Sequence, residues 1–242
     1  MIKGIFEVAS GMMPRITKQD VIANNMANTN TVGYKRDRVF LDKIVEEQAK
    51  LIHTDYDWQD PMINSAFIDH SQAILDKTDN SLDIALDGEG FFVIETGRGT
   101  RYTRNGEMHV DANGILKDAR GNTYLSDAGP VILQNAEPSI DSEGNIFDGG
   151  EQVGRLRVVQ FENPQALSKD DGVCFIAPED VEPLPASGFS IRQGFLERSN
   201  VSILDQMVDM IATFRDFESG QKAITIQDEA IGQSINRVGR TY

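Results

Sequence analysis

The last forty residues constrain the fold most, because they contain no proline and repeat apolar residues at a spacing of seven. Two series offset by three positions run through this segment: Met207, Phe214, Gln221, Asp228 and Ile235, and then Met210, Phe217, Ile224, Ile231 and Val238. This spacing is typical of the a and d positions of a coiled-coil helix. Ser202 and Asp205 have the spacing of a capping box at its start. The sequence therefore predicts a helix from about 202 to 238.

The N-terminal segment repeats the pattern. Its two series are Ile2, Ala9, Ile16 and Ala23, and then Ile5, Met12, Gln19 and Met26. We expect the run N-T-N-T at residues 28–31 to end this helix, with Gly33 available for a left-handed backbone turn. Pro14 removes a backbone hydrogen bond inside the helix, so we expect a bend between Ser10 and Pro14.

Two amphipathic helices separated by a whole domain are expected to bury their apolar faces by packing. They can pack on each other within one chain or form a seam between chains, and the heptads alone leave both arrangements open. The two ends are nearly neutral and the middle is strongly acidic, which favours helices buried in an assembly with the middle domain outside.

A cluster of asparagines at the end of the first helix admits two interpretations. Asn24, Asn25, Asn28 and Asn30 can end the helix, which is the interpretation that we favour, or their amides can bind adjacent subunits. The candidate assembly interface consists of the heptad positions and three of these amides: Ile2, Ile5, Met12, Ile16, Met26, Asn24, Asn25, Asn28, Met207, Met210, Phe214, Phe217, Ile224, Ile231, Ile235 and Val238.

The middle of the chain is predicted to be β structure, because short apolar runs alternate with turn sequences such as D-A-N-G at residues 111–114 and D-S-E-G at 141–144. The predicted fold class is α+β, with an antiparallel β-rich central domain and long N- and C-terminal heptad helices that form an assembly domain. The expected boundaries are residues 1–45 plus 198–242 for the helical domain, 46–81 for an extended arm and 82–197 for the β domain. Within the region before the β domain, residues 41–51 could form a short helix.

The composition excludes several functions. The net charge of -15 opposes binding to nucleic acid and to an anionic membrane surface. No apolar run is long enough to span a membrane. Glu7 interrupts the only apolar run near the N-terminus that resembles a signal peptide, so we expect no cleavable signal.

The sequence offers no constellation typical of a catalytic, cofactor-binding or metal-binding site. His53, His70 and His109 stand apart without metal-ligand spacing. Cys174, in the apolar run V-C-F-I, is predicted to be a buried small hydrophobe rather than a nucleophile. A carboxylate pair such as Asp87 and Glu89 is expected by chance in so acidic a chain. We therefore expect neither an enzyme nor a bound cofactor.

Several motifs together resemble the flagellar rod and hook axial protein family. They are A-S-G-M at residues 9–12, D-V-I-A-N-N-M-A-N-T-N-T-V-G-Y-K-R at 20–36, L-D-I-A-L-D-G-E-G-F-F-V at 82–93, R-Y-T-R-N-G at 101–106 and G-F-L-E-R-S-N-V at 194–201. The matches lie at both ends and in the centre, so the resemblance covers nearly the whole chain. The short length and the stretch V-G-R-L-R-V-V at residues 153–159 resemble a proximal-rod protein more than a distal-rod or hook protein.

The resemblance implies a structural subunit of the flagellar basal-body rod, which polymerises through its terminal helices and transmits torque from motor to hook. It implies export by the flagellar type III apparatus, a place in the periplasmic rod, and copies of itself and other rod proteins as partners. Two alternatives remain: a distal-rod or hook protein of the same family, and a β-domain hydrolase or carbohydrate-binding module. The second alternative should have an aromatic-lined pocket, for which the single tryptophan, Trp58, offers little.

Overall fold

The computed structural model describes residues 2–40, 65–135 and 137–238, and its chain divides into two compact units. The described part of the helical unit comprises residues 2–27, 37–40, 65–67 and 202–238, and that of the β unit comprises Asn28–Arg36, 68–135 and 137–201. The predicted short helix at residues 41–51, His53 and Trp58 lie outside the described residues. The fold class is α+β, as predicted, with a mostly antiparallel β-rich central region and two helices.

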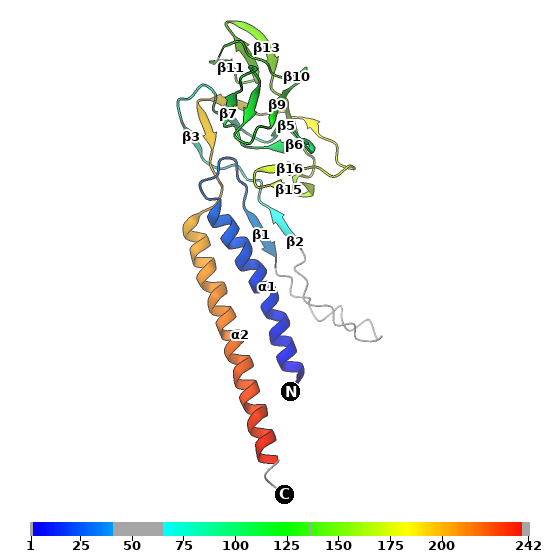
Figure 1. Cartoon of the computed structure of the whole chain (residues 1–242), viewed down its shortest axis with the longest axis vertical. Helices are drawn as coiled ribbons and strands as arrows, with labels where there is room; N and C mark the ends of the chain where they lie inside the picture. Colours follow the sequence, from blue (N-terminus) through cyan, green and yellow to red (C-terminus); the bar gives the residue numbers. More distant parts are fainter. Residues whose placement is uncertain (1, 41–64, 136, 239–242) are drawn as a thin grey trace. The chain divides into compact units, whose positions relative to one another are not determined.

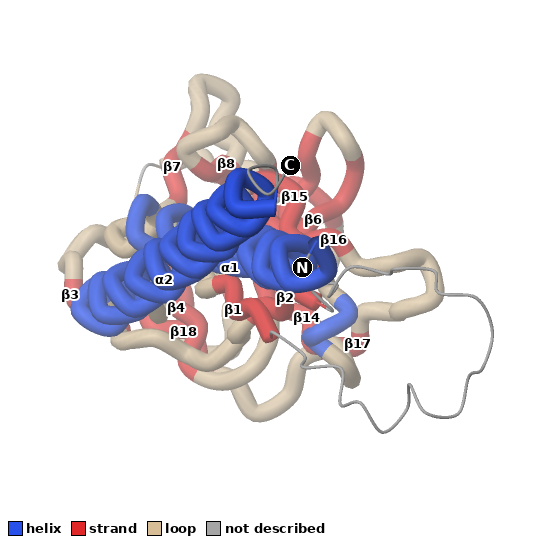
Figure 2. Tube along the Cα trace, turned by 90° about the horizontal axis from the view of Figure 1, so that it is seen from below, coloured by secondary structure: helices blue, strands red, loops and turns tan. Residues whose placement is uncertain are grey.

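Two helices form most of the helical unit, and they run antiparallel and side by side (Figures 1 and 2). The shorter, α1, spans Ile2–Ala27 and is continuous across Pro14, and the longer, α2, spans Ile203–Val238. Asn25 near the end of α1 hydrogen-bonds Gln206 near the start of α2. Further along the pair, Met12 and Arg15 of α1 lie against Gly220 of α2. The two predicted helices therefore pack on each other within one chain.

The inward face of α2 differs in part from the predicted heptad. Met210, Phe217, Ile224 and Ile231 of the second predicted series are half-buried, as expected for a packed face. The first series is not on this face, because Met207, Phe214, Gln221 and Asp228 are all exposed. Its place alongside the second series is taken by Gln206, Thr213 and Gly220, which are buried. Small and polar residues here let α1 approach closely, which hydrophobic periodicity alone does not reveal.

The faces of α1 divide in the same way. Met12 and Met26 of its second series are half-buried, whereas Ile16 and Ala23 of its first series are exposed. The side chains of Ile2, Ile5, Ile235 and Val238 lie outside the described residues. In both helices, one predicted series serves the intramolecular pair and the other is left facing outward.

The β unit contains most of the strands. The strands before residue 115 are β1 Asp37–Phe40, β2 Ser65–Ile68, β3 Leu75–Lys77, β4 Ile84–Asp87, β5 Phe91–Thr96, β6 Gly99–Thr103 and β7 Met108–Val110. The next are β8 Leu116–Asp118, β9 Thr123–Ser126, β10 Gly129–Pro130, β11 Ser139–Ile140, β12 Asn145–Asp148, β13 Glu151–Arg155 and β14 Val158–Gln160. After the 3-10 helix η2 Pro164–Ala166 come β15 Ser168–Asp171, β16 Cys174–Ile176, β17 Leu184–Pro185, β18 Ser190–Gln193 and β19 Phe195–Glu197.

The strands pair mainly as antiparallel neighbours. The largest sheet follows the order β15-β16-β6-β5-β9-β8-β7, with β10, β14 and β17 at its side, and β11-β12-β13 form a second sheet. The last two strands close the unit by pairing with early ones: β18 lies on β4, and β19 lies on β3. The two short strands β1 and β2 form a separate ribbon. The chain segment before α2 is thus built into the start of the β region.

The predicted turns are confirmed at Asp111 and Asp141, and a third turn of the same form begins at Asp118. In each, the aspartate Oδ1 accepts hydrogen bonds from the backbone N–H groups two and four residues later. The glycine three residues after each aspartate has a positive φ, which glycine adopts without steric cost. Sequence-local chemistry therefore fixes these turns.

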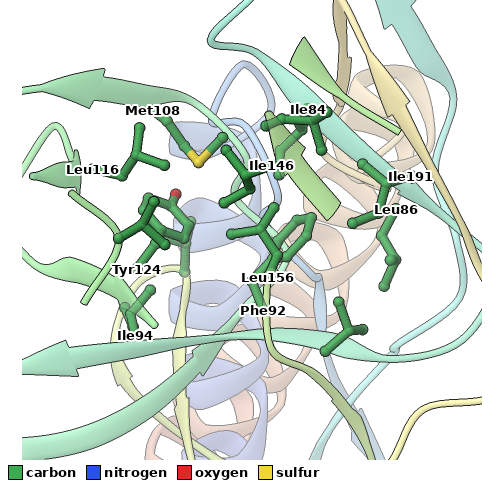
Figure 3. Close-up of a cluster of buried hydrophobic side chains, with 14 of the residues drawn as sticks. Ile84, Leu86, Phe92, Ile94, Met108, Leu116, Tyr124, Ile146, Leu156 and Ile191 are labelled. Atoms are coloured by element: carbon green, nitrogen blue, oxygen red, sulfur yellow. The ribbon is translucent and has the colours of Figure 1, made fainter. Parts of the chain in front are cut away.

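The β unit encloses a continuous apolar core, part of which is shown in Figure 3. The core brings together residues from strands far apart in the sequence, among them Leu86, Phe92, Tyr124, Ile146 and Ile191. Phe92 and Tyr124 meet edge to face, with ring centroids 6.3 Å apart. Burial of apolar side chains on this scale is the main source of stability of such a domain.

Candidate functional site

The first three turns of α2 carry an exposed apolar stripe, which we name the α2 stripe. It consists of Ile203, Leu204, Met207, Val208, Ile211 and Phe214, with between 46% and 72% of each residue exposed. The buried residues Gln206 and Thr213 lie on the other side of the helix, where it meets α1. After Phe214 this outer side becomes polar, with Arg215, Glu218 and Lys222 exposed. Six large apolar residues in twelve positions leave much hydrophobic surface in water.

The predicted interface residues fall into distinct groups. Met207 and Phe214 belong to the α2 stripe, and Ile16 is exposed on α1. Met210, Phe217, Ile224 and Ile231 are half-buried on the inner side of α2, as are Met12 and Met26 on α1. Four residues of the stripe were not predicted: Leu204, Val208 and Ile211 fall outside a strict two-position heptad, and Ile203 precedes the first residue of the predicted series. The signal available for them was the high number of apolar residues between 204 and 214, which is too many for one narrow face of a helix.

Asn25 has an in-chain role that neither interpretation of the asparagine cluster foresaw. It is buried, with 2% exposed, and its Oδ1 accepts from the Asp37 backbone N–H at 2.9 Å. Its Nδ2 donates to the Asp37 carbonyl at 2.8 Å and to Gln206 Oε1 at 3.2 Å. The amide thereby joins the end of α1, the start of β1 and the first turn of α2. These three bonds use the Asn25 amide within the chain.

The other asparagines lie at the helix end. Asn28 Oδ1 accepts from the Thr31 hydroxyl at 3.2 Å, in the turn that follows Ala27. Asn24 and Asn30 are exposed. Gly33 completes the turn with φ of 68°, as predicted. A Cβ at Gly33 would lie 2.4 Å from the Asn105 backbone nitrogen, so only glycine fits there.

A buried polar cluster in the β unit, which we name the Glu197 hub, gathers Lys35, Arg104, Glu197 and Asn200 with the backbone groups they bind. Glu197 and Lys35 are 0% exposed and Arg104 is 4% exposed. The Lys35 ammonium lies 2.5 Å from Glu197 Oε1, and Arg104 Nη1 lies 3.4 Å from Oε2. All three residues stand in the family-like motifs at residues 20–36, 101–106 and 194–201. The motifs alone did not predict a role for these three residues.

The charges of the hub are bound to backbone groups as well as to one another. Lys35 Nζ also donates to the Ser71 carbonyl at 2.8 Å, and Glu197 Oε1 accepts from the Ala73 N–H at 2.9 Å. Arg104 Nη2 donates to the Gly88 carbonyl at 2.8 Å. Burial lowers the pKa of Lys35 and of Arg104, and Glu197 opposes this by favouring their charged forms. One carboxylate is shared between two cations, so the hub has more positive than negative charge.

Asn200 joins two backbone segments at the edge of the hub. Its Oδ1 accepts from the Arg36 backbone N–H at 2.7 Å, and its Nδ2 donates to the Asp69 carbonyl at 2.7 Å. The Arg36 guanidinium in turn pairs with the Asp69 carboxylate at 2.8 Å. The Glu197 carbonyl accepts from the Gly33 N–H at 2.8 Å. Residues far apart in sequence are therefore held side by side.

His70 packs beside the hub in an aromatic setting. Its ring meets Phe91 and Phe175 edge-on, with centroids 5.5 Å and 5.2 Å away. Burial, together with the positive charges of Lys35 and Arg104, lowers the pKa of His70 to about 4. The imidazole is therefore neutral at neutral pH, and this arrangement is one of packing rather than proton transfer.

The described residues contain little that resembles a catalytic site. Cys174 is buried, as predicted, and burial raises the pKa of its thiol to about 11. Asp87 forms an ion pair with Arg192 at the surface, at 2.6 Å. Within the described ranges, His, Cys, Asp and Glu form no group of three or more that could hold a metal ion. Among the helical residues that the structure describes, no helix is long and apolar enough to cross a membrane.

Comparison with known proteins links both ends and the centre of the chain to one family. Three family models match: "Flagella basal body rod protein" at residues 8–35, "Flagellar hook protein FlgE/F/G D1 domain" at 85–147, and "Flagellar basal body rod FlgEFG protein C-terminal" at 192–237. The flagellar basal-body rod protein FlgG of Bacillus subtilis is 32% identical, over 98% of this chain and 99% of the relative. The chain belongs to the flagellar basal-body rod protein family.

Other relatives agree with this assignment. The flagellar basal-body rod protein FlgF of Caulobacter vibrioides is 28% identical over 91% of each chain, and that of Escherichia coli is 28% identical over 97% of each. The chain is thus a structural subunit of the bacterial flagellar basal-body rod, as the sequence motifs predicted. The hub residues Lys35 and Glu197 lie inside the first and last of the three matched regions, and Arg104 lies inside the central one.

Proposed function

We propose that this rod subunit polymerises through the α2 stripe, with copies of itself and other rod proteins as partners. The observation that carries the proposal is the exposure of six large apolar residues on one side of α2, while its other side is already occupied by α1. An intramolecular helix pair would need no such outer surface. In this proposal, packing within one chain and a seam between chains both occur, one on each side of α2.

The size of the stripe is adequate for a stable contact. Complete burial of one large aliphatic or aromatic side chain contributes about 1.5–3 kcal/mol, and these side chains are roughly half-exposed. Covering the exposed halves of all six therefore contributes on the order of 6 kcal/mol per subunit before ordering costs are subtracted. Because contacts repeat from subunit to subunit without closing a ring, they generate a helical tube.

The remaining functional predictions extend this proposal. A tube in which each subunit is held by several neighbours transmits torque from motor to hook. The proposal includes a periplasmic position, export by the flagellar type III apparatus, and no catalysed reaction. The proximal-rod position stays a prediction, because the matched relatives include both FlgG and FlgF proteins.

The proposal is tested by placing a charge on the stripe. Ile211→Asp puts a carboxylate on a residue that is 55% exposed in the monomer, so the purified protein should keep its fold. In the assembly the same carboxylate would be buried without a partner, which is costly. In a strain lacking the native gene, we expect Ile211→Asp to be secreted but to give no complete rods by electron microscopy and no swimming.

Two control variants separate the stripe from the rest of the helix. Ile226→Asp makes the same change at an exposed isoleucine outside the stripe, and Glu218→Gln alters an exposed polar residue. Both should assemble and swim. Ile224→Asp, on the half-buried inner side, should instead lower the melting temperature of the monomer. Normal rods with Ile211→Asp, or equal failure of Ile226→Asp, would show that the stripe is not the contact surface.

A further inference from the structure

The Glu197 hub lies within the β unit, and its residues are close in sequence to the positions where the chain enters or leaves that unit. The β unit begins with Asn28–Arg36, is re-entered at Ile68 and ends at Val201. Three segments next to these crossing points meet in the hub: residues 33–36 after α1, 69–73 after β2, and 197–200 before α2. Segments 33–36 and 197–200 are separated by about 160 residues in sequence, with Lys35 and Glu197 162 positions apart.

Each of the three segments is bound to both of the others. Segment 33–36 reaches segment 197–200 through the Lys35–Glu197 pair, and segment 69–73 through the bond from Lys35 to the Ser71 carbonyl. Segment 69–73 reaches segment 197–200 through the bond from the Ala73 N–H to Glu197 Oε1. Asn200 repeats this three-way connection with the backbone of Arg36 and Asp69.

This pattern prevents the segments from opening one at a time. If segment 33–36 leaves, Glu197 loses its closest cation and the Ser71 carbonyl loses the closer of its two donors. If segment 197–200 leaves, Lys35 and Arg104 remain as buried cations without a carboxylate. An unpaired buried charge costs far more than a lost surface contact. The least costly opening is therefore one in which water reaches the whole hub and all three segments are released.

We propose that the Glu197 hub is a conformational coupling device, through which the segment after α1 and the segment before α2 open and close as one element. A change in the segment after α1 is thereby felt in the segment before α2 through bonds within the β unit. The inference concerns the isolated subunit and does not depend on how the rod assembles.

Hydrogen–deuterium exchange of the full-length monomer tests the coupling. Lys35→Met changes one side chain of segment 33–36 and removes its bonds to the Ser71 carbonyl and to Glu197. Coupling predicts that exchange accelerates by a similar factor, at least about tenfold, in segments 33–36, 69–73 and 197–200. The matched control is Lys77→Met, which removes a lysine from an exposed pair with Asp79 and should change none of the three.

The single cysteine provides an independent measure of opening of the whole β unit. Cys174 is buried in the core, so its labelling by a thiol reagent should accelerate less than about threefold in Lys35→Met. Acceleration confined to segment 33–36 would overturn the proposal, and so would Cys174 labelling that accelerates as much as the three segments do.

A second measurement covers the case in which Lys35→Met does not fold. Exchange of the unchanged protein can be followed in low concentrations of urea. Coupled segments share one opening reaction, so their exchange rates should rise with the same dependence on urea. Different urea dependences for segments 33–36 and 197–200 would overturn the proposal.

Discussion

The buried amide of Asn25 provides the sharpest test of how the helical unit is held together. Asn25→Ala removes three hydrogen bonds, two to the Asp37 backbone and one to Gln206 Oε1. It leaves the Gln206 side chain, which is 7% exposed, without this donor. The end of α1, the start of β1 and the first turn of α2 all lose a shared anchor.

The expected loss of stability follows from the number and burial of these bonds. A hydrogen bond between neutral groups contributes about 1 kcal/mol net, and a buried polar group left without its partner costs about 1–3 kcal/mol. Water can reach the half-buried Asp37 backbone in the variant, which limits that part of the loss. We therefore expect Asn25→Ala to lower the free energy of unfolding of the helical unit by about 3 kcal/mol.

Urea unfolding followed by far-ultraviolet circular dichroism measures this loss, because the helices dominate the signal. Asn30→Ala, an exposed residue of the same asparagine cluster, is the control and should change stability by less than about 0.5 kcal/mol. A double-mutant cycle with Gln206→Ala should give a coupling of about 1 kcal/mol. A loss below about 0.5 kcal/mol for Asn25→Ala, or no coupling to Gln206, would refute the reasoning.

Three further predictions concern the β unit. Gly33→Ala should lower the free energy of unfolding of the β unit by at least about 2 kcal/mol more than Gly121→Ala does. Both glycines have a positive φ, but only at Gly33 would a Cβ collide with a neighbour, the Asn105 backbone. Equal losses in urea unfolding would contradict this. Stability should fall as pH decreases from about 6.5 to about 4, because the unfolded chain protonates His70 in this range and the folded chain does not. His70 accounts for up to about 3 kcal/mol of this fall, which His70→Gln should remove, and an unchanged pH slope in that variant would count against it. Cys174, with its thiol pKa raised to about 11, should react with a thiol reagent at pH 8 only as the unit unfolds, and rapid labelling of the native protein would show that it is accessible.

Much of the local structure could be predicted from the sequence. The helix end after Ala27 and the left-handed Gly33 followed from the N-T-N-T run and the glycine after it. The turns at Asp111 and Asp141 followed from an aspartate three residues before a glycine. At the helix end and in the aspartate turns the decisive bonds join residues within five positions of one another, so the local sequence contains all of the partners.

The candidate site was only partly predictable, for the same physical reason. Periodicity marked Met207 and Phe214 as apolar helix positions, but it could not say which side of α2 would meet α1. That choice depends on Gln206, Thr213 and Gly220, whose small or polar side chains become an inner face only when α1 is present to contact them.

The sequence by itself determined the two helices, the turns, the β-rich centre and, through its motifs, the family. Only the tertiary structure decided that Asn25 anchors a junction and that Lys35, Arg104 and Glu197 share one buried cluster. Such charged residues are normally exposed, so nothing local indicates their burial. They are buried here because the fold brings a carboxylate from the last β-strand against cations that precede it by 93 and 162 residues. A charge enters a protein interior only with its partner, and that partner is known only once the chain has folded.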